Sequence, residues 1–223
     1  TYTLYISRLK EELIKEKQTD EYIEACVKYA ERLIFRELPV IFDIKHLSLL
    51  LGIFPSDLCN YIWLPENFFY SKKLIPKKRG GYRQLNIPAK KLKEIQRWIL
   101  DNILINIRIS DHAMGFCNDR SIVTNAEKHL GSHYVLNIDL KDFFPSISYD
   151  KVFYVFKYYG YTKEISYILA RLCTYQRSLP QGAPTSPTLS NIICLKLDKR
   201  LSRLAEKNHI VYTRYADDMT FSS

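Results

Sequence analysis

The sequence predicts an α+β fold in which helices precede two separate groups of strands. Three observations favour it: apolar residues at helical spacing near the N-terminus, two short strand patterns joined by a glycine turn, and a strand–helix–strand–strand order towards the C-terminus. The chain has 223 residues, of which 47% are hydrophobic and 26% are charged, so it can bury the core of one large domain or two small ones. This composition excludes long disorder and collagen-like structure.

Helical patterns dominate the N-terminal region. Apolar residues share one helix face between Tyr2 and Leu38, and a proline follows. A second helix is expected from Ile44 to Leu51, where a glycine stops it, and Ser56 is a suitable N-cap for a short third helix. We interpret these helices as packing elements.

A β-hairpin is predicted next. Strand patterns run from Asn67 to Pro76 and from Tyr82 to Pro88, and Arg79-Gly80-Gly81 between them is a turn signal. Apolar spacing then predicts an amphipathic helix from Leu92 to Ile103, and Ser121 could cap another helix that runs to His129.

The C-terminal half begins with residues 133–139, whose alternation predicts a buried strand that ends at Asp139. A proline-rich stretch, Leu179 to Pro187, fits no regular element and is expected to be a rigid loop. The other predicted elements are helices over 150–158, 163–174 and 188–207, a strand over 210–215, a tight turn at Asp217-Asp218, and a last strand over 219–221.

The positive charge is concentrated in one segment. The chain holds 33 Lys and Arg against 24 Asp and Glu, a net charge of +9. Lys72 to Arg97 alone holds ten basic residues and one acidic residue, so the remainder is neutral overall. Such a patch indicates a polyanionic partner such as nucleic acid, nucleotide phosphates or an anionic membrane, although a solvated surface is the simpler alternative.

The sequence gives no sign of secretion or of a membrane span. No run approaches the roughly 20 apolar residues that a spanning helix needs, and the N-terminus lacks a signal sequence, so we expect a cytoplasmic protein with no membrane partner. The cysteines are odd in number and form no C-x-x-C pair, which favours reduced, mostly buried thiols over disulfides or zinc ligands. They are Cys26, Cys59, Cys117, Cys173 and Cys194.

Three aspartates are expected to converge at one edge of a sheet. Asp139 ends one predicted strand, and Asp217 and Asp218 lie in the turn between two others. Clustered carboxylates can hold two Mg²⁺ ions about 3.5–4 Å apart for phosphoryl transfer, and Mg²⁺ prefers hard oxygen ligands. A solvated Asp-Asp turn is the alternative, but apolar residues precede both sites, and burying idle carboxylates would be costly.

These motifs together resemble reverse transcriptases. Tyr215-Ala216-Asp217-Asp218 resembles their Y-x-D-D box, and Leu179-Pro180-Gln181-Gly182 resembles their L-P-Q-G loop. Asn137-Ile138-Asp139-Leu140-Lys141-Asp142-Phe143-Phe144 resembles the first catalytic-aspartate motif, and the order and spacing also match. Asn125-Ala126-Glu127-Lys128-His129 is similar to the N-A-x-x-H pattern of bacterial retron reverse transcriptases. The resemblance runs from about Phe69 to the C-terminus.

The resemblance implies a right-hand polymerase fold, with an antiparallel palm sheet packed on helices. Residues 1–66 would form a helical N-terminal extension, residues 67–136 the fingers and residues 137–223 the palm, with some intermixing of fingers and palm. Because family members continue into a thumb, we expect the chain to be a fragment of a longer polypeptide.

The resemblance also assigns site residues. Asp139, Asp217 and Asp218 would be catalytic and, with the Leu140 carbonyl, would bind metal. The residues that would contact the nucleotide are Lys77 and Arg83 at the triphosphate, Gln181 in the pocket, and Phe144 as a gate that excludes a 2′-hydroxyl. Phe144 could instead be plain core.

RNA contacts are predicted at two places. Lys90, Lys91 and Lys93 follow the hairpin and would bind RNA phosphates. Asn125 and His129 lie four residues apart on a predicted helix, so they share a face and offer hydrogen bonds suited to RNA. They could instead tie the helix to a neighbouring loop.

The function implied by the resemblance is an RNA-directed DNA polymerase of retron type, acting in bacterial antiphage defence. It would add dNTPs to a primer on its own structured noncoding RNA, giving a DNA product, with two Mg²⁺ ions or Mn²⁺ as a substitute, and an effector protein could be a further partner. Two alternatives stay open. One is another bacterial reverse transcriptase, group II intron-like or defence-associated, and the other is a non-catalytic scaffold that binds RNA or a toxin.

Overall fold

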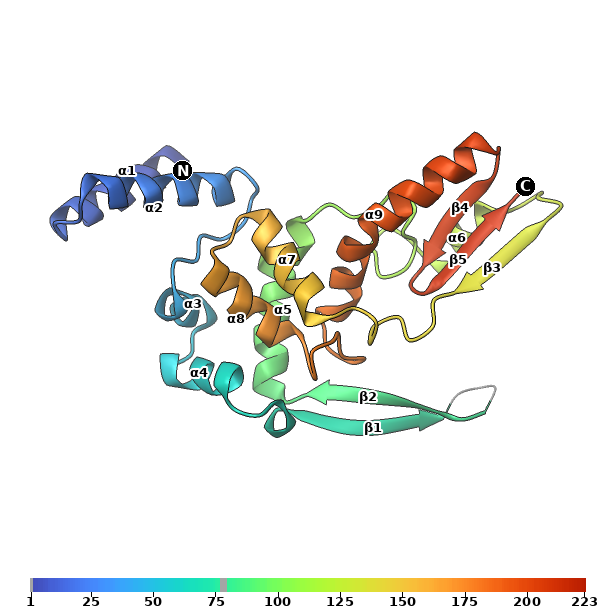
Figure 1. Ribbon diagram of the computed structural model, residues 1–223, viewed down its shortest axis with the longest axis horizontal. Coiled ribbons are helices and arrows are strands. Elements are labelled where there is room, and N and C mark those ends of the chain that lie inside the picture. The colour runs from blue at the N-terminus through green and yellow to red at the C-terminus, as the bar shows by residue number, and fades with distance from the viewer. Residues whose placement is uncertain (1, 77–79) are drawn as a thin grey trace.

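The N-terminal region forms two helices packed side by side in the computed structural model, which describes residues 2–76 and 80–223 (Figure 1). They are α1 (Tyr2–Lys15) and α2 (Asp20–Ile34). The sequence predicted one helical stretch here, but the left-handed backbone of Lys17, with φ of 55°, breaks it. The Thr19 side chain then accepts a hydrogen bond from the Tyr22 amide and starts α2.

The next two helices are α3 (Ile44–Leu51) and α4 (Pro55–Trp63). Gly52 ends α3 in the left-handed conformation, with φ of 64°, as its position in the sequence predicted. The prediction of Ser56 as an N-cap is wrong, because α4 already begins at Pro55 and Phe54 occupies the cap position. Proline suits the first helical position, since its fixed φ is helical and its missing N–H would be unpaired there anyway.

The predicted β-hairpin is present and points away from the helices (Figure 1). Strand β1 (Tyr70–Pro76) pairs antiparallel with β2 (Tyr82–Pro88). The first strand starts at Tyr70 rather than Asn67, because Pro65 initiates a 3₁₀ turn, η1 (Glu66–Phe68). The predicted turn residue Arg79 lies outside the described residues.

Most helices share one apolar core. Residues of α1 to α4 pack with those of the later helices, and Phe156, Leu169 and Leu189 lie at its centre with no exposed surface. The last helix begins at Ser186, two residues earlier than the sequence predicted, because Pro187 fits within its first turn. The remaining helical elements are α5 (Lys90–Asn102), η2 (Leu104–Asn106), α6 (Ile122–Glu127), α7 (Tyr149–Tyr159), α8 (Lys163–Cys173) and α9 (Ser186–Lys207).

A three-stranded antiparallel sheet lies at the end of the molecule opposite α1 and α2 (Figure 1). Its order is β3 (Val135–Asp139), β5 (Asp218–Ser222), β4 (Val211–Tyr215). Helix α9 covers β4 and β5 through a small second core. The prediction that the first strand is buried is wrong: all five residues of β3 are exposed, because β3 is an edge strand and the second core centres on its two neighbours.

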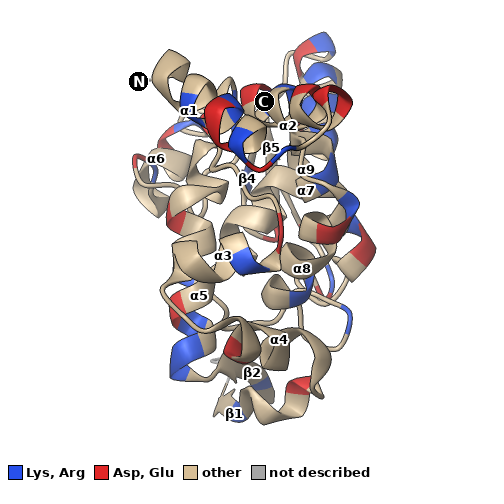
Figure 2. Ribbon diagram, turned by 90° about the vertical axis from the view of Figure 1, so that its left-hand side faces the viewer, with Lys and Arg blue, Asp and Glu red and all other residues tan. Residues whose placement is uncertain are grey.

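The surface carries charges of both signs. In Figure 2, basic and acidic segments lie side by side on the outer helices α1 and α2, where Lys15–Glu12 and Lys28–Glu24 form ion pairs. Among the described helices, none combines the length and apolar character that crossing a membrane requires. All five cysteines are free, and the expectation of mostly buried thiols is wrong, since Cys173 and Cys194 are buried and the other three are half-buried.

Candidate active site

The register of the sheet brings the three predicted aspartates to one end, as the sequence predicted. Asp139 on β3 is the direct partner of Asp218 on β5, and Asp218 is also the partner of Tyr215 on β4. The Leu140 amide donates a hydrogen bond to the Asp217 carbonyl oxygen at 3.0 Å, which joins the end of β3 to the turn. Two chain segments, the end of β3 and the β4–β5 turn, therefore present the three carboxylates at the same end of the sheet.

The carboxylates are more accessible than their apolar neighbours in the sequence suggested. Asp139 and Asp218 are exposed and Asp217 is half-buried, so the expectation of buried carboxylates is wrong. The cause is the position of β3 at the sheet edge and of Asp217 in a turn. Partial burial, and then the charges of Asp217 and Asp139, raise the pKa of Asp218.

These residues suit a hard divalent cation by their chemistry. Neighbouring carboxylates repel one another, and a cation between them relieves that repulsion; after partial burial, the charges of Asp217 and Asp139 contribute to the raised pKa of Asp218. Carboxylate oxygens are the ligands that Mg²⁺ prefers. Within residues 2–76 and 80–223, however, no three Asp, Glu, His or Cys side chains lie in an arrangement ready to hold a metal ion.

A buried arginine holds the turn from behind. Arg214 has no exposed surface, and its Nε and Nη2 donate to the two carboxylate oxygens of Asp198 on α9, each at 2.8 Å. Its Nη1 donates to the Ala216 carbonyl at 2.9 Å and to Asn191 Oδ1 at 3.1 Å. Burial lowers the pKa of Arg214, but the hydrogen-bonded Asp198 carboxylate outweighs this and raises it. The Ala216 carbonyl thus links the turn to α9 through Arg214.

The segment before α6 runs along β4 and supports the same turn. The Arg214 amide donates to the His112 carbonyl at 2.8 Å, and the Met114 amide donates to the Arg214 carbonyl at 2.7 Å. Gly115 then passes so close to the turn that a Cβ there would lie 2.8 Å from the Ala216 nitrogen. Only glycine fits at this crossing without a backbone shift.

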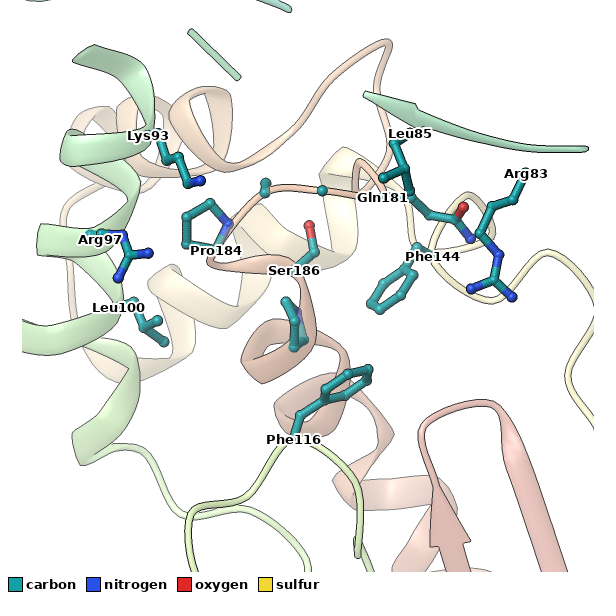
Figure 3. A pocket seen from close by; sticks show the side chains of 13 residues that line it. Arg83, Leu85, Lys93, Arg97, Leu100, Phe116, Phe144, Gln181, Pro184 and Ser186 are labelled. Atoms are coloured by element: carbon teal, nitrogen blue, oxygen red, sulfur yellow. The ribbon is translucent and has the colours of Figure 1, made fainter. Parts of the chain in front are cut away.

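A cavity of about 460 Å³ lies between β2, α5 and the start of α9 (Figure 3). It brings together three of the predicted nucleotide-binding residues, Arg83, Phe144 and Gln181. The fourth, Lys77, lies outside the described residues. The full lining comprises Arg83, Leu85, Lys93, Arg97, Leu100, Phe116, Phe144, Gln181, Gly182, Ala183, Pro184, Ser186 and Pro187.

The loop that carries Gln181 is fixed to the hairpin. The Asn86 amide on β2 donates to the Gln181 carbonyl at 2.7 Å. Gly182 has a φ of 125°, and a Cβ there would lie 2.9 Å from the Asn86 carbonyl oxygen. Ser186 Oγ donates to the Pro180 carbonyl at 2.8 Å and closes the loop onto the start of α9. These contacts agree with the predicted rigid loop.

The two adjacent phenylalanines have different surroundings. Phe143 is buried in the main core, with 5% of its surface exposed, whereas Phe144 is half-buried and lines the cavity. A plain core position, the alternative considered for Phe144, therefore describes Phe143 better. The role of Phe144 as a gate stays a prediction.

The predicted RNA-binding lysines of α5 do not act as one group. Lys93 lines the cavity together with Arg97, one helical turn further along (Figure 3). Lys90 and Lys91 are exposed and do not line it. Helix α5 thus presents basic side chains both to the cavity and to the outer surface.

Asn125 and His129 do not share a helix, since α6 ends at Glu127. The His129 ring nitrogens lie 2.7 Å from the hydroxyls of Ser222 and Thr213, and partial burial lowers the pKa of His129. Asn125 Oδ1 is buried and has no hydrogen-bond partner among the described residues. This geometry favours the alternative that His129 ties the segment to the sheet, and RNA binding by the pair stays a prediction.

Sequence reasoning missed several residues of the site. Arg97 belonged to the noted charge run but was not singled out, and Phe116 lines the cavity without a motif that marks it. Tyr212-Thr213-Arg214 resembles a retron pattern, but Asp198 carries no local signal, and its pairing with Arg214 joins a helix to a strand.

Comparison with known proteins gives consistent matches. Residues 75–223 match the family described as reverse transcriptase (RNA-dependent DNA polymerase). The Retron Ec86 reverse transcriptase of Escherichia coli is 42% identical over 188 residues, covering 83% of this chain and 58% of that protein. The Retron Mx162 reverse transcriptase of Myxococcus xanthus is 42% identical over 171 residues, covering 69% of this chain and 35% of that protein.

A more distant relative comes from a eukaryote. The putative COX1/OXI3 intron 1 protein of Saccharomyces cerevisiae is 34% identical over 146 residues, covering 57% of this chain and 17% of that protein. The chain therefore spans little more than half the length of the retron relative from Escherichia coli, and much less of the other two.

Proposed function

The chain belongs to the reverse transcriptase family, and from this premise we propose that it forms the fingers and palm of an RNA-directed DNA polymerase of retron type. The observation that carries the proposal is the pairing of Asp139 with Asp218 beside the turn of Asp217. In the proposed right-hand arrangement, residues 1–66 are an extension, 67–136 the fingers and 137–223 the palm.

The carboxylates are proposed to hold the catalytic cations. Asp139, Asp217 and Asp218, with the Leu140 carbonyl, would bind two Mg²⁺ ions, for which Mn²⁺ could substitute. Bound divalent ions neutralise phosphate charge and make the attacking hydroxyl a better nucleophile. The protein's own part is to hold these oxygen ligands at one edge of the sheet, through the register of β3 with β5 and through Arg214 behind the turn.

The cavity is proposed to bind the incoming dNTP. Arg83 and, by resemblance, Lys77 would neutralise charge on the triphosphate, as cationic side chains do in phosphoryl transfer. Gln181, on a loop fixed to β2, would line the nucleotide site. The Phe144 ring, which lines the cavity, would leave no room for a 2′-hydroxyl and would thereby favour deoxynucleotides.

The template and partners belong to the proposal as well. Lys90, Lys91 and Lys93 would bind phosphates of a structured noncoding RNA, whose copying yields the DNA product. The similarity to retron reverse transcriptases supports an RNA template and a DNA product. An effector protein, a role in antiphage defence and a cytoplasmic location complete the hypothesis.

A reverse transcriptase of intron type is the second candidate, which the similarity to the yeast intron protein favours. The non-catalytic scaffold has less support, because the three aspartates meet at one edge of the sheet. The RNA that copurifies with the full-length protein distinguishes the retron type from the intron type. It should be a short structured RNA for a retron-type enzyme and an intron for an intron-type enzyme.

The decisive experiment is primer extension by the full-length protein with Asp217→Asn, which removes a carboxylate charge but little volume. We expect incorporation to be abolished while RNA binding stays close to the wild-type level. Asp20→Asn, on the exposed start of α2, is the matched control and should extend normally. Extension by Asp217→Asn at more than a few per cent of the wild-type rate would refute the assignment.

A further inference from the structure

Among the described residues of the cavity wall, Phe116 and Phe144 are the large aromatic side chains, and no motif accounts for Phe116. We propose that Phe116 is a second specificity-determining residue, which contacts the sugar and base of the incoming deoxynucleoside triphosphate. This inference rests on the proposed function of the cavity.

The first observation is the position of the ring. Phe116 reaches the cavity from the segment before α6 and lies next to Phe144, with the two ring centroids 6.1 Å apart and the ring planes 43° apart (Figure 3). Phe116 is 46% exposed, so a large part of its surface has no protein partner within the described chain. The two rings form one continuous aromatic wall.

The second observation is the backbone of Phe116. Its φ is 61°, in the left-handed region that bulky residues rarely adopt, because Cβ crowds the following carbonyl oxygen. Such a conformation persists only where the surrounding contacts impose it, and it is often found at ligand sites. A phenylalanine in this conformation, with its ring half exposed at the cavity, favours a role for the ring beyond filling the core.

The contacts that impose this conformation come from both sides of Phe116. Asn191 Nδ2 on α9 donates to the Gly115 carbonyl at 2.9 Å. Arg120 Nη1 donates to the Ala113 carbonyl at 2.6 Å, and the Cys117 thiol donates to the same oxygen at 3.2 Å. Because Asn191 also accepts from Arg214, the segment that aims Phe116 is tied to the support of the aspartate turn.

The chemistry of the cavity indicates what the ring contacts. Arg83 and Gln181 lie at one side, and Lys93 and Arg97 lie at another, so the polar and charged parts of a nucleotide have partners there (Figure 3). The aromatic wall offers only apolar surface and π faces, which suit the sugar and the base. A stacked base on an aromatic ring is a recurrent contact in nucleic-acid-binding proteins.

The test uses the full-length protein with Phe116→Ala, Phe116→Tyr and Phe116→Gly. We measure dNTP affinity by equilibrium titration, KM and kcat on one primed RNA template, rNTP incorporation relative to dNTP, and the melting temperature. Phe116→Ala should raise both the dissociation constant and KM about tenfold, at the lower end of the range for one aromatic–base contact, with kcat much less affected. Phe116→Tyr keeps the ring and should stay within about twofold of the wild type.

Phe116→Gly separates function from folding. Glycine adopts a φ of 61° without strain, so the melting temperature of Phe116→Gly should be no lower than that of Phe116→Ala. Its affinity for dNTPs should nevertheless be as low as that of Phe116→Ala. His209→Gly is the matched control: His209 is exposed, has a φ of 57° and does not line the cavity, so its KM should stay at the wild-type value.

Two results would overturn the inference. One is an unchanged dissociation constant and KM in the folded Phe116→Ala and Phe116→Gly variants, and the other is a wild-type protein that binds no dNTP. A wild-type protein that binds dNTPs but never incorporates them would refute the proposed polymerase function alone, and weaker binding by Phe116→Ala would still support the role of Phe116.

Discussion

Replacing Asp198 with asparagine should destabilise the protein by about 3–5 kcal/mol, because it leaves the Arg214 cation buried without its counter-ion. Both side chains are 0% exposed, and the pair is joined by two hydrogen bonds of 2.8 Å, so water cannot replace the lost carboxylate charge. For a domain of this size the expected fall in melting temperature is about 6–20 °C.

The assay is urea denaturation of Asp198→Asn and of the double variant Asp198→Leu with Arg214→Met. Apolar residues of similar size often replace a buried ion pair at little cost, so the double variant should recover most of the stability. It should nevertheless lose primer extension, because the Ala216 carbonyl no longer receives its hydrogen bond from Arg214.

An exposed ion pair supplies the control. Lys28 and Glu24 lie 2.6 Å apart on α2, with side chains 71% and 66% exposed, and Glu24→Gln should leave stability unchanged within error. A loss below about 1 kcal/mol for Asp198→Asn would refute the argument from burial. Full primer extension by the double variant would show that Arg214 does not position the turn.

Four further predictions concern the cavity, the start of helix α5 and the sheet. Phe144→Ala should admit ribonucleotides with little change in melting temperature, since Phe143 already fills the core; a collapsed fold would contradict this. Arg83→Ala should raise the KM for dNTPs, whereas Lys90→Ala with Lys91→Ala should weaken RNA binding and reduce the log–log salt slope by about 0.7–0.9 for each lost phosphate contact. An unchanged salt dependence of RNA binding in the variant with Lys90→Ala and Lys91→Ala would show that these lysines face solvent. Because burial lowers the pKa of His129, its neutral form stabilises the fold above about pH 6.5, and that stability should be lost as pH falls below this value. The urea denaturation midpoint of His129→Gln should vary less with pH around this value than that of the wild type. An equal pH dependence of the midpoint in the two proteins would exclude His129 as the cause.

Local signals in the sequence were sufficient for most elements. The apolar runs and the glycine turn predicted β2 with both ends correct, and Ser121 caps α6 through a reciprocal pair of hydrogen bonds with Thr124. These features depend on residues within a few positions of each other, so they can be read from the chain directly. The convergence of Asp139 with the Asp217 turn also followed from the order of strands.

Features that depend on distant contacts were missed. Whether β3 is buried depends on what packs beside it, and its alternating pattern could not show that it is an edge strand. The cap of α4 was misplaced because Pro55 competes with Ser56 for the first turn. The sequence does not show that Arg214 is buried, and only the fold shows that Asp198 lies beside it.

The buried pair beneath the aspartate turn has an electrostatic consequence. An arginine without a counter-ion could also hold the turn through its five N–H donors. Its positive charge, however, would weaken the negative potential that attracts a divalent cation. Asp198 lies 2.8 Å from the guanidinium, so the two charges form a compact dipole whose field declines with distance much faster than that of a single ion. The turn is therefore anchored by a cation while the negative field of Asp139, Asp217 and Asp218 is left almost intact at the surface.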